Sequence, residues 1–325
     1  MRQFRFEYID AESFGEDLYA FQKQRQSSQT ETKLFQIFSE VLEPETIETV
    51  CTVIGRIFPD TLYMGCSTSG NIVDCELSSR ITVVCTVFEL PSTRVGLFQY
   101  DLSGDSVDGI TEMILEETRK NPWVKAMELY FTIPERSTTR FCDNLKGVRE
   151  DIQIFGGVAC SDDITSDASC VFSNVLGILT RSVVVIFYGG DELYVESVNV
   201  TGWKPLGRKF RVTRSDGSVL QELDGIPAYD VYHTYLNIKN DENFFYNTLE
   251  FPLFYEHNNT TILRTPVASN ADGSITMTSD IDIGSVVRIS YGDPGTIVES
   301  IRQDSGKIAA FQPDLLHIFS CAARR

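Results

Sequence analysis

The stretch Leu62-Tyr63-Met64-Gly65-Cys66-Ser67-Thr68-Ser69-Gly70 decides the fold, because an apolar strand runs directly into a loop of small residues. A second stretch, Ile152-Gln153-Ile154-Phe155-Gly156-Gly157-Val158-Ala159-Cys160-Ser161, repeats the pattern further along the chain. Glycine has no Cβ and tolerates positive φ, so such loops let the backbone approach another backbone or a ligand. Ligands of α/β proteins bind beyond the carboxyl ends of strands, so the two loops predict the linings of one binding crevice.

The composition describes a folded acidic protein. Among 325 residues, 42% are hydrophobic and 23% are charged, and the formal net charge is −18. This charge argues against binding to nucleic acid or to acidic lipid, since both need clustered Lys and Arg. No apolar run reaches the roughly 20 residues that span a bilayer, and the N-terminus has no signal-peptide core. We therefore expect a cytoplasmic protein without nucleic-acid or membrane partners.

The eight cysteines are predicted to be reduced and packed. Several lie in apolar runs such as Ile81–Phe88, where a free thiol behaves as a small hydrophobe. No pair has Cys-x-x-Cys spacing, and only His233, His257 and His317 supply imidazole, so neither a structural zinc site nor another metal is expected.

The order of elements predicts an internal duplication. The first half begins with a predicted helix over about 13–25, with Ser13 as its cap, followed by a strand over 33–39. A helix after Pro44 and a strand over 61–66, which ends at the first loop, come next. Two neighbouring strands over 80–89 and 94–100 complete this half. Helix, strand, helix, strand and small-residue loop then recur about 91 residues later. We expect an α/β fold in which duplicated helix-strand units, about 13–100 and 106–190, form mixed sheets flanked by helices.

A second α/β domain is expected toward the C-terminus. Residues 193–201 alternate like a strand, and Gly202–Gly207 breaks it, so the junction is placed between domains 1–202 and 203–325. Helices are expected near 226–236 and 296–303, and a last strand over 315–320. Because that strand ends in small residues at the end of the chain, the second domain is predicted to be truncated.

Five motifs in order resemble the FIST family, named for F-box and intracellular signal transduction proteins. They are Gly65–Gly70, Phe155–Ala159, Gly202–Pro205, Leu223–Ala228 and Phe319–Arg324. The resemblance implies an N-terminal and a C-terminal FIST domain that together form a sensory module for small ligands such as amino acids. In bacteria such a module often precedes a signalling output domain, for example a diguanylate cyclase, and we expect this bacterial context.

Catalysis and nucleotide binding find little support in the motifs. A nucleophilic Cys66 or Cys160 requires a nearby cation or base, and all three histidines lie beyond residue 230. Gly65 and Gly70 have the glycine spacing of a phosphate-binding loop, but Asn71-Ile72 replaces its Lys-Ser/Thr. We expect a non-catalytic domain without a cofactor.

The candidate ligand-binding residues suit a zwitterion. Asp162 and Asp163 would hold an ammonium group, while Ser67, Thr68 and Ser69, with the backbone around Gly65, Cys66, Gly156 and Gly157, would bind a carboxylate. The alternative is that the aspartates cap a turn and the serines satisfy local backbone donors. Trp203 either stacks on the ligand or seals the domain junction, and Arg324 either anchors a carboxylate or frays at the chain end.

The sequence therefore predicts a small-ligand sensor with an amino-acid-like ligand, covalently linked to an output domain. The rival is a protein-interaction or scaffolding module whose acidic surface binds a partner protein.

Overall fold

The computed structural model describes residues 1–25, 31–104, 106–132, 138–161, 168–257 and 260–321. The chain forms two compact units. Unit 1 comprises Met1–Pro134, Asn144–Ser197 and Pro313–Ser320, and unit 2 comprises Glu135–Asp143, Val198–Gln312 and Cys321–Arg325. The long segment Val198–Gln312 belongs to unit 2, and the chain then returns to unit 1 for eight residues at Pro313.

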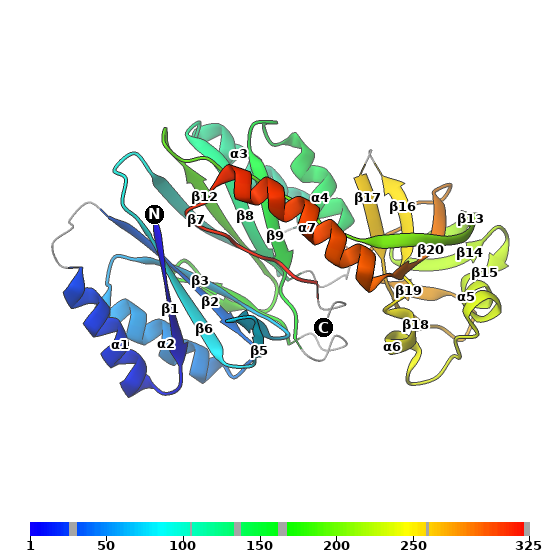
Figure 1. Ribbon diagram of the computed structural model, residues 1–325, viewed down its shortest axis with the longest axis horizontal. Coiled ribbons are helices and arrows are strands. Elements are labelled where there is room, and N and C mark those ends of the chain that lie inside the picture. Colours follow the sequence, from blue (N-terminus) through cyan, green and yellow to red (C-terminus); the bar gives the residue numbers. More distant parts are fainter. Residues whose placement is uncertain (26–30, 105, 133–137, 162–167, 258–259, 322–325) are drawn as a thin grey trace. The chain divides into compact units, whose positions relative to one another are not determined.

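Unit 1 contains two mixed sheets (Figure 1). The first has the order β1-β6-β2-β3-β10-β11, with β1 (Arg2–Tyr8), β2 (Thr32–Ser39), β3 (Leu62–Ser67), β6 (Ile81–Phe88), β10 (Val171–Ser173) and β11 (Gly177–Leu179). The second has the order β7-β12-β8-β9, with β7 (Arg94–Asp101), β8 (Val124–Phe131), β9 (Gln153–Val158) and β12 (Ser182–Gly189). A small hairpin of β4 (Asn71–Val73) and β5 (Glu76–Ser78) follows β3.

The two sheets share one topology. The order β1-β6-β2-β3 in the first sheet matches the order β7-β12-β8-β9 in the second, and β10 and β11 extend the first sheet beyond β3. The parallel pairs are β2 with β3 and β8 with β9, and the other pairings are antiparallel. The mixed sheets flanked by helices agree with the predicted fold class.

Helices α1 (Ala11–Gln24) and α2 (Pro44–Ile57) cover the outer face of the first sheet. The α1 helix buries Phe14, Leu18 and Phe21, a stripe at helical spacing. Its N-cap is Asp10, whose carboxylate accepts hydrogen bonds from two backbone amides, so the prediction of Ser13 as the cap is wrong. Pro44 occupies the first turn of α2, as its fixed φ favours.

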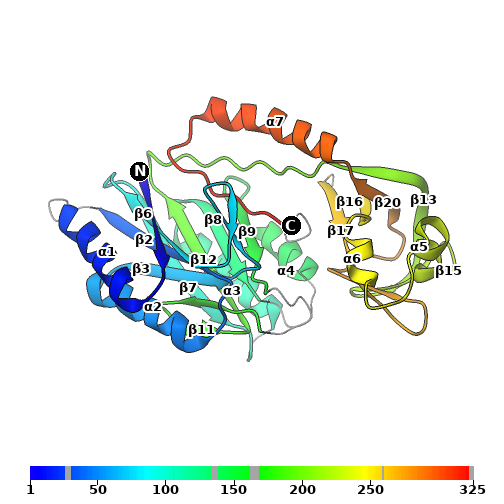
Figure 2. The same cartoon turned by 60° about the horizontal axis from the view of Figure 1, so that its bottom comes forward.

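The inner face of the first sheet packs against the second sheet. Along β2, Phe35 and Ile37 face the helices, whereas Leu34 and Phe38 belong to the cluster between the sheets. Side chains alternate along a strand, so Gln36 also faces the second sheet. The helix α3 (Val107–Lys120) lies on the far side of the second sheet, giving unit 1 four layers in the order helix, sheet, sheet, helix (Figures 1 and 2).

The short helix α4 (Thr139–Asn144) and the 3₁₀ helix η1 (Leu145–Gly147) replace the helix expected before β9. The strands β6 and β7, predicted to be neighbours, lie in different sheets, because each pairs within its own copy of the shared topology.

Unit 2 is built on one antiparallel sheet with its own core. Its strand order is β17-β16-β20-β13-β14-β19-β18, with β15 beside β14. The strands are β13 (Trp203–Asp216), β14 (Val219–Leu223), β15 (Ile226–Pro227), β16 (Leu253–His257), β17 (Thr260–Arg264), β18 (Pro266–Ser269), β19 (Ile275–Met277) and β20 (Val286–Gly292). The helices are α5 (Ala228–Leu236), α6 (Phe244–Thr248) and α7 (Pro294–Phe311).

Two predicted strands, over 193–201 and 315–320, are not strands in the structure, which assigns no sheet pairing to either segment. Leu193 and Val195 pack into the core between the sheets of unit 1. The alternating sequence pattern therefore reflects the burial of these side chains and not the hydrogen bonding of a strand. Residues Trp203–Gly207, expected to interrupt a strand, instead form the beginning of β13.

Candidate functional site

The predicted glycine loops lie partly inside strands. Gly65 is the fourth residue of β3, and Gly156 is the fourth residue of β9. A Cβ on Gly65 would lie 2.2 Å from the ring of Phe172, and one on Gly156 would lie 1.9 Å from the carbonyl oxygen of Leu129. Both glycines therefore permit close packing, the first under a ring from β10 and the second against the backbone of β8.

The carboxyl ends of β3 and β9 meet within unit 1. The amide of Cys160 donates to the carbonyl oxygen of Ser67 at 3.2 Å, and its thiol contacts the Ser69 hydroxyl at 3.6 Å. The Ser67 hydroxyl accepts from the amide of Cys170, and the Thr68 hydroxyl donates to Asn71. The structure thus brings the two predicted linings together, while their polar side chains make local bonds.

The remaining predicted site residues lie elsewhere. Asp162, Asp163 and Arg324 fall outside the described residues. Trp203 belongs to unit 2, where its indole packs against Gly292 of β20.

A buried carboxylate that the sequence analysis missed lies between the two sheets. Glu128 on β8 is 1% exposed and is surrounded by hydrogen-bond donors. The hydroxyls of Tyr130 and Tyr188 donate to its two oxygens at 2.6 and 2.5 Å, and the Gln36 amide donates at 3.1 Å. His317, from the C-terminal segment, places Nδ1 2.9 Å from Oε1. The carboxylate therefore receives bonds from both sheets and from the chain end.

The charges of this cluster support each other. Burial by itself raises the pKa of Glu128, but the His317 charge and the hydrogen bonds from His317 and the two tyrosines outweigh it, so the pKa is lowered. Burial likewise acts to lower the pKa of His317, and the Glu128 charge and hydrogen bond reverse this into a raised pKa. Each partner thus shifts the pKa of the other in the direction that favours the ionised pair. Burial and the Glu128 charge raise the pKa values of Tyr130 and Tyr188, so both remain donors.

Aromatic rings surround the imidazole of His317. The ring of Phe319 stacks on it at a centroid distance of 4.5 Å, and Phe38 meets it edge-on at 5.7 Å. Phe319 in turn contacts Tyr130 at 5.9 Å and Phe155 at 6.2 Å. The C-terminal segment thus places the imidazole of His317 among aromatic rings and next to the buried carboxylate of Glu128.

Two predicted site residues flank this cluster. The charges of Cys160, Cys170 and Glu128 add to burial in raising the pKa of the Cys66 thiol well above its usual range. Its thiol form predominates at neutral pH, which is the opposite of what a nucleophile needs. A Cβ on Gly157 would lie 3.7 Å from Phe319.

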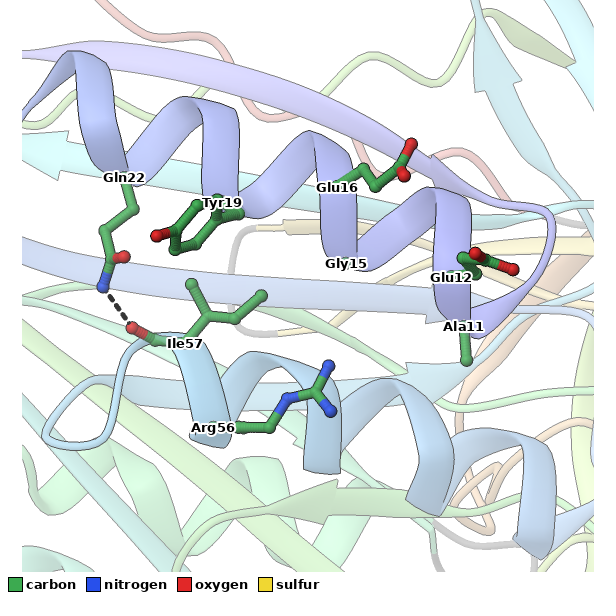
Figure 3. Close-up of a pocket in the computed structure, with 8 residues that line it drawn as sticks. All are labelled: Ala11, Glu12, Gly15, Glu16, Tyr19, Gln22, Arg56 and Ile57. Carbon is green, nitrogen blue, oxygen red and sulfur yellow. Dashed lines mark hydrogen bonds between the residues drawn. The ribbon is translucent and has the colours of Figure 1, made fainter.

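A separate groove lies between α1 and α2 (Figure 3). It encloses about 490 Å³ and is lined by Ala11, Glu12, Gly15, Glu16, Tyr19, Gln22, Arg56 and Ile57. Gln22 closes one end with a hydrogen bond to the carbonyl of Ile57, while Glu12, Glu16 and Arg56 are exposed. Hydrated surface charges give weak, screened interactions, so this groove offers less for recognition than the buried cluster.

Within the described ranges, no three His, Cys, Asp or Glu side chains group as a metal ion requires. In the same part of the chain, no helix is both long and apolar enough to cross a membrane.

Unit 1, with two sheets of matching strand order, and the α/β unit 2 define the class of this protein as a two-part module. The profile of the FIST N domain matches residues 33–226, and that of the FIST C domain matches residues 228–325. The chain therefore belongs to the FIST family, whose domains are sensory domains of signalling proteins.

The chain is also similar to an uncharacterized protein, MJ1623, of Methanocaldococcus jannaschii. The two are 27% identical over 186 residues, which span 53% of this chain and 36% of that protein. This chain therefore matches about a third of the length of that relative.

Proposed function

We propose that this chain is a non-catalytic sensor that binds an amino-acid-like small molecule in unit 1 and regulates a covalently linked signalling output domain. Membership of the FIST family supports the sensory role. The observation that carries the ligand site is the meeting of the β3 and β9 ends through Ser67, Ser69 and Cys160. Strand ends of this kind are where ligands of α/β proteins bind.

In this proposal the small residues at the strand ends bind the ligand carboxylate. Asp162 and Asp163, which follow Cys160 in the sequence, hold its ammonium group. A signal arises only when the ligand binds one conformation of the protein more tightly than another.

The test is a thermal-shift screen of the full chain against the common amino acids and their decarboxylated amines. A ligand present at 100 times its dissociation constant adds about 2.7 kcal/mol to stability, a clear rise in melting temperature. The double variant Asp162→Asn, Asp163→Asn is expected to abolish the shift, and Asp60→Asn, on the exposed turn before β3, is a matched control. Unchanged melting across the whole panel would overturn the proposal in favour of the scaffolding role.

A further inference from the structure

The C-terminal segment Pro313–Ser320, here called the tail, is held on unit 1 by few side chains. His317 is 23% exposed and reaches inward to Glu128, whereas Leu316 and Ile318 on either side are 51% and 70% exposed. The tail is extended without forming a strand, so no sheet ladder secures it. Segments with exposed backbone and few buried contacts open more readily than the packed core. The tail, drawn in red in Figures 1 and 2, is therefore suited to leave its site.

The site that the tail occupies is built by the sheets rather than by the tail. The carboxylate of Glu128 accepts hydrogen bonds from Gln36, Tyr130 and Tyr188, which all lie on strands of the two sheets. Those three donors are neutral, so they leave the negative charge of Glu128 uncompensated. A buried charge without a partner is costly, and a cation that replaces the imidazolium is strongly favoured.

The rings define the shape of that cation. Phe38 and Tyr130 lie on opposite strands, 6.1 Å apart between centroids, and Phe155 lies on β9 beside β8. Aromatic faces attract flat cations by stacking and by cation–π interaction. The site thus selects a positively charged nitrogen group carried on or next to a planar ring.

We propose that the Glu128 site binds a small molecule with a protonated imidazole or arylalkylamine group, and that His317 is the tethered competitor which this ligand displaces. The inference rests on the proposed sensory function and names the ligand class and its regulation. Ligand binding releases the tail, which follows α7 directly in the chain. Because the tail occupies the site in the absence of ligand, the apparent affinity equals the intrinsic affinity multiplied by the fraction of open site.

The experiment is isothermal titration of the full chain with histamine, which carries both an imidazole and an ammonium group. His317→Ala removes the competitor and is expected to tighten histamine binding by about tenfold, since docked tail lowers the open fraction. Leu316→Ala, an exposed neighbour on the same tail, is the matched control and is expected to leave the affinity unchanged. Glu128→Gln is expected to abolish binding, and imidazole-4-acetate, which has the same ring with an anionic arm, is expected not to bind.

Hydrogen exchange of residues 313–320 provides a second readout in the unmodified chain. Histamine at saturation is expected to speed exchange of the tail while exchange of β8 slows. Histamine binding that is equal in the wild type and in His317→Ala, or that leaves tail exchange unchanged, would overturn the inference.

The outcomes also separate the inference from the proposed function. If an amino acid from the thermal-shift screen binds both the wild type and Glu128→Gln, the proposed sensory function is supported and the proposed ligand site at Glu128 is rejected. If neither amino acids nor histamine bind the wild type or His317→Ala, both proposals fail.

Discussion

The two sheets of unit 1 have the same strand order but different chemistry at matching positions. Gln36 is the fifth residue of β2, Glu128 is the fifth residue of β8, and the two side chains bond to each other across the interface. Two residues further along each strand, Phe38 faces Tyr130. The first sheet thus contributes an amide and a phenyl ring where the second contributes an acid and a phenol.

A third matching position extends the contrast. Tyr188 pairs with the third residue of β8, and Thr86 pairs with the third residue of β2. Tyr188 bonds to Glu128, whereas the hydroxyl of Thr86 is buried with no partner among the described residues. The strand order is repeated and the ionisable groups are not, so the acid and both tyrosines of the buried cluster come from the second sheet.

The comparison predicts the largest effect at Glu128. Glu128→Ala removes the acceptor shared by Tyr130, Tyr188, Gln36 and His317 and leaves these donors buried without it. Loss of one partner from a buried ion pair costs about 3–5 kcal/mol of unfolding free energy. Gln36→Ala removes one neutral donor and is expected to cost about 1–2 kcal/mol. Urea unfolding of both variants measures the difference, and equal costs would show that the two sheets contribute alike.

The two glycines sharpen the comparison of the strands. Gly156→Ala places a Cβ against the backbone of Leu129 at a φ of +142°, and the overlap and strain together are expected to cost about 3 kcal/mol. Gly65→Ala meets the ring of Phe172 first and the carbonyl oxygen of Ile37 next, at 2.6 Å, so the added variant Phe172→Leu is expected to recover only part of its cost. Unfolding free energies of the single and double variants give the coupling. Rescue of Gly156→Ala by a side-chain truncation would contradict the assignment of backbone contact.

These elements also show what the sequence could predict. The strand-helix order and the glycine positions follow from local patterns, and the mixed sheets flanked by helices are confirmed. The small residues after β3 and β9 predicted that two linings lie near one another, and the contact of Cys160 with Ser67 and Ser69 agrees.

Glu128 was missed because its role depends on partners far away in the sequence. One signal was present, since a single Glu within the apolar stretch Ala126–Phe131 requires a buried partner. Nothing local identifies that partner as His317, which follows the long segment Val198–Gln312 of unit 2. The alternating pattern of the tail predicts a strand. Whether such a segment pairs with a sheet depends on the fold around it, which the sequence alone does not reveal.

The ion pair between His317 and Glu128 predicts a pH dependence of moderate size. The raised pKa of His317 means that its stabilisation is fully present below pH 6.5 and is lost as the pH rises through the raised value. The lowered pKa of Glu128 means that its own contribution is present above about pH 4.5 and is lost as the pH falls through the lowered value. The other ionisable groups facing the pair, Tyr130, Tyr188 and Cys66, have raised pKa values and stay neutral in this range.

The measurement compares the wild type with His317→Gln across this range. A charged hydrogen bond contributes about 1.5 kcal/mol, so the difference in unfolding free energy is expected to be about that size near pH 6 and to shrink at alkaline pH. Leu316→Ala is expected to show no such pH-dependent difference from the wild type. A difference that grows with rising pH would contradict the ionised pair.

The smallest effect is expected at the other charged contact of the tail. Asp314 lies 3.6 Å from the N-terminal ammonium of Met1 and is 70% exposed, so its pairing is hydrated and screened. Asp314→Asn is expected to change stability by less than about 0.5 kcal/mol and to leave tail exchange close to that of the wild type. Hydrogen exchange of residues 313–320 in Asp314→Asn and His317→Ala tests this directly. Faster exchange in Asp314→Asn than in His317→Ala would contradict this prediction. It would show that the contact with Met1 holds the tail more strongly than the contact with Glu128 does.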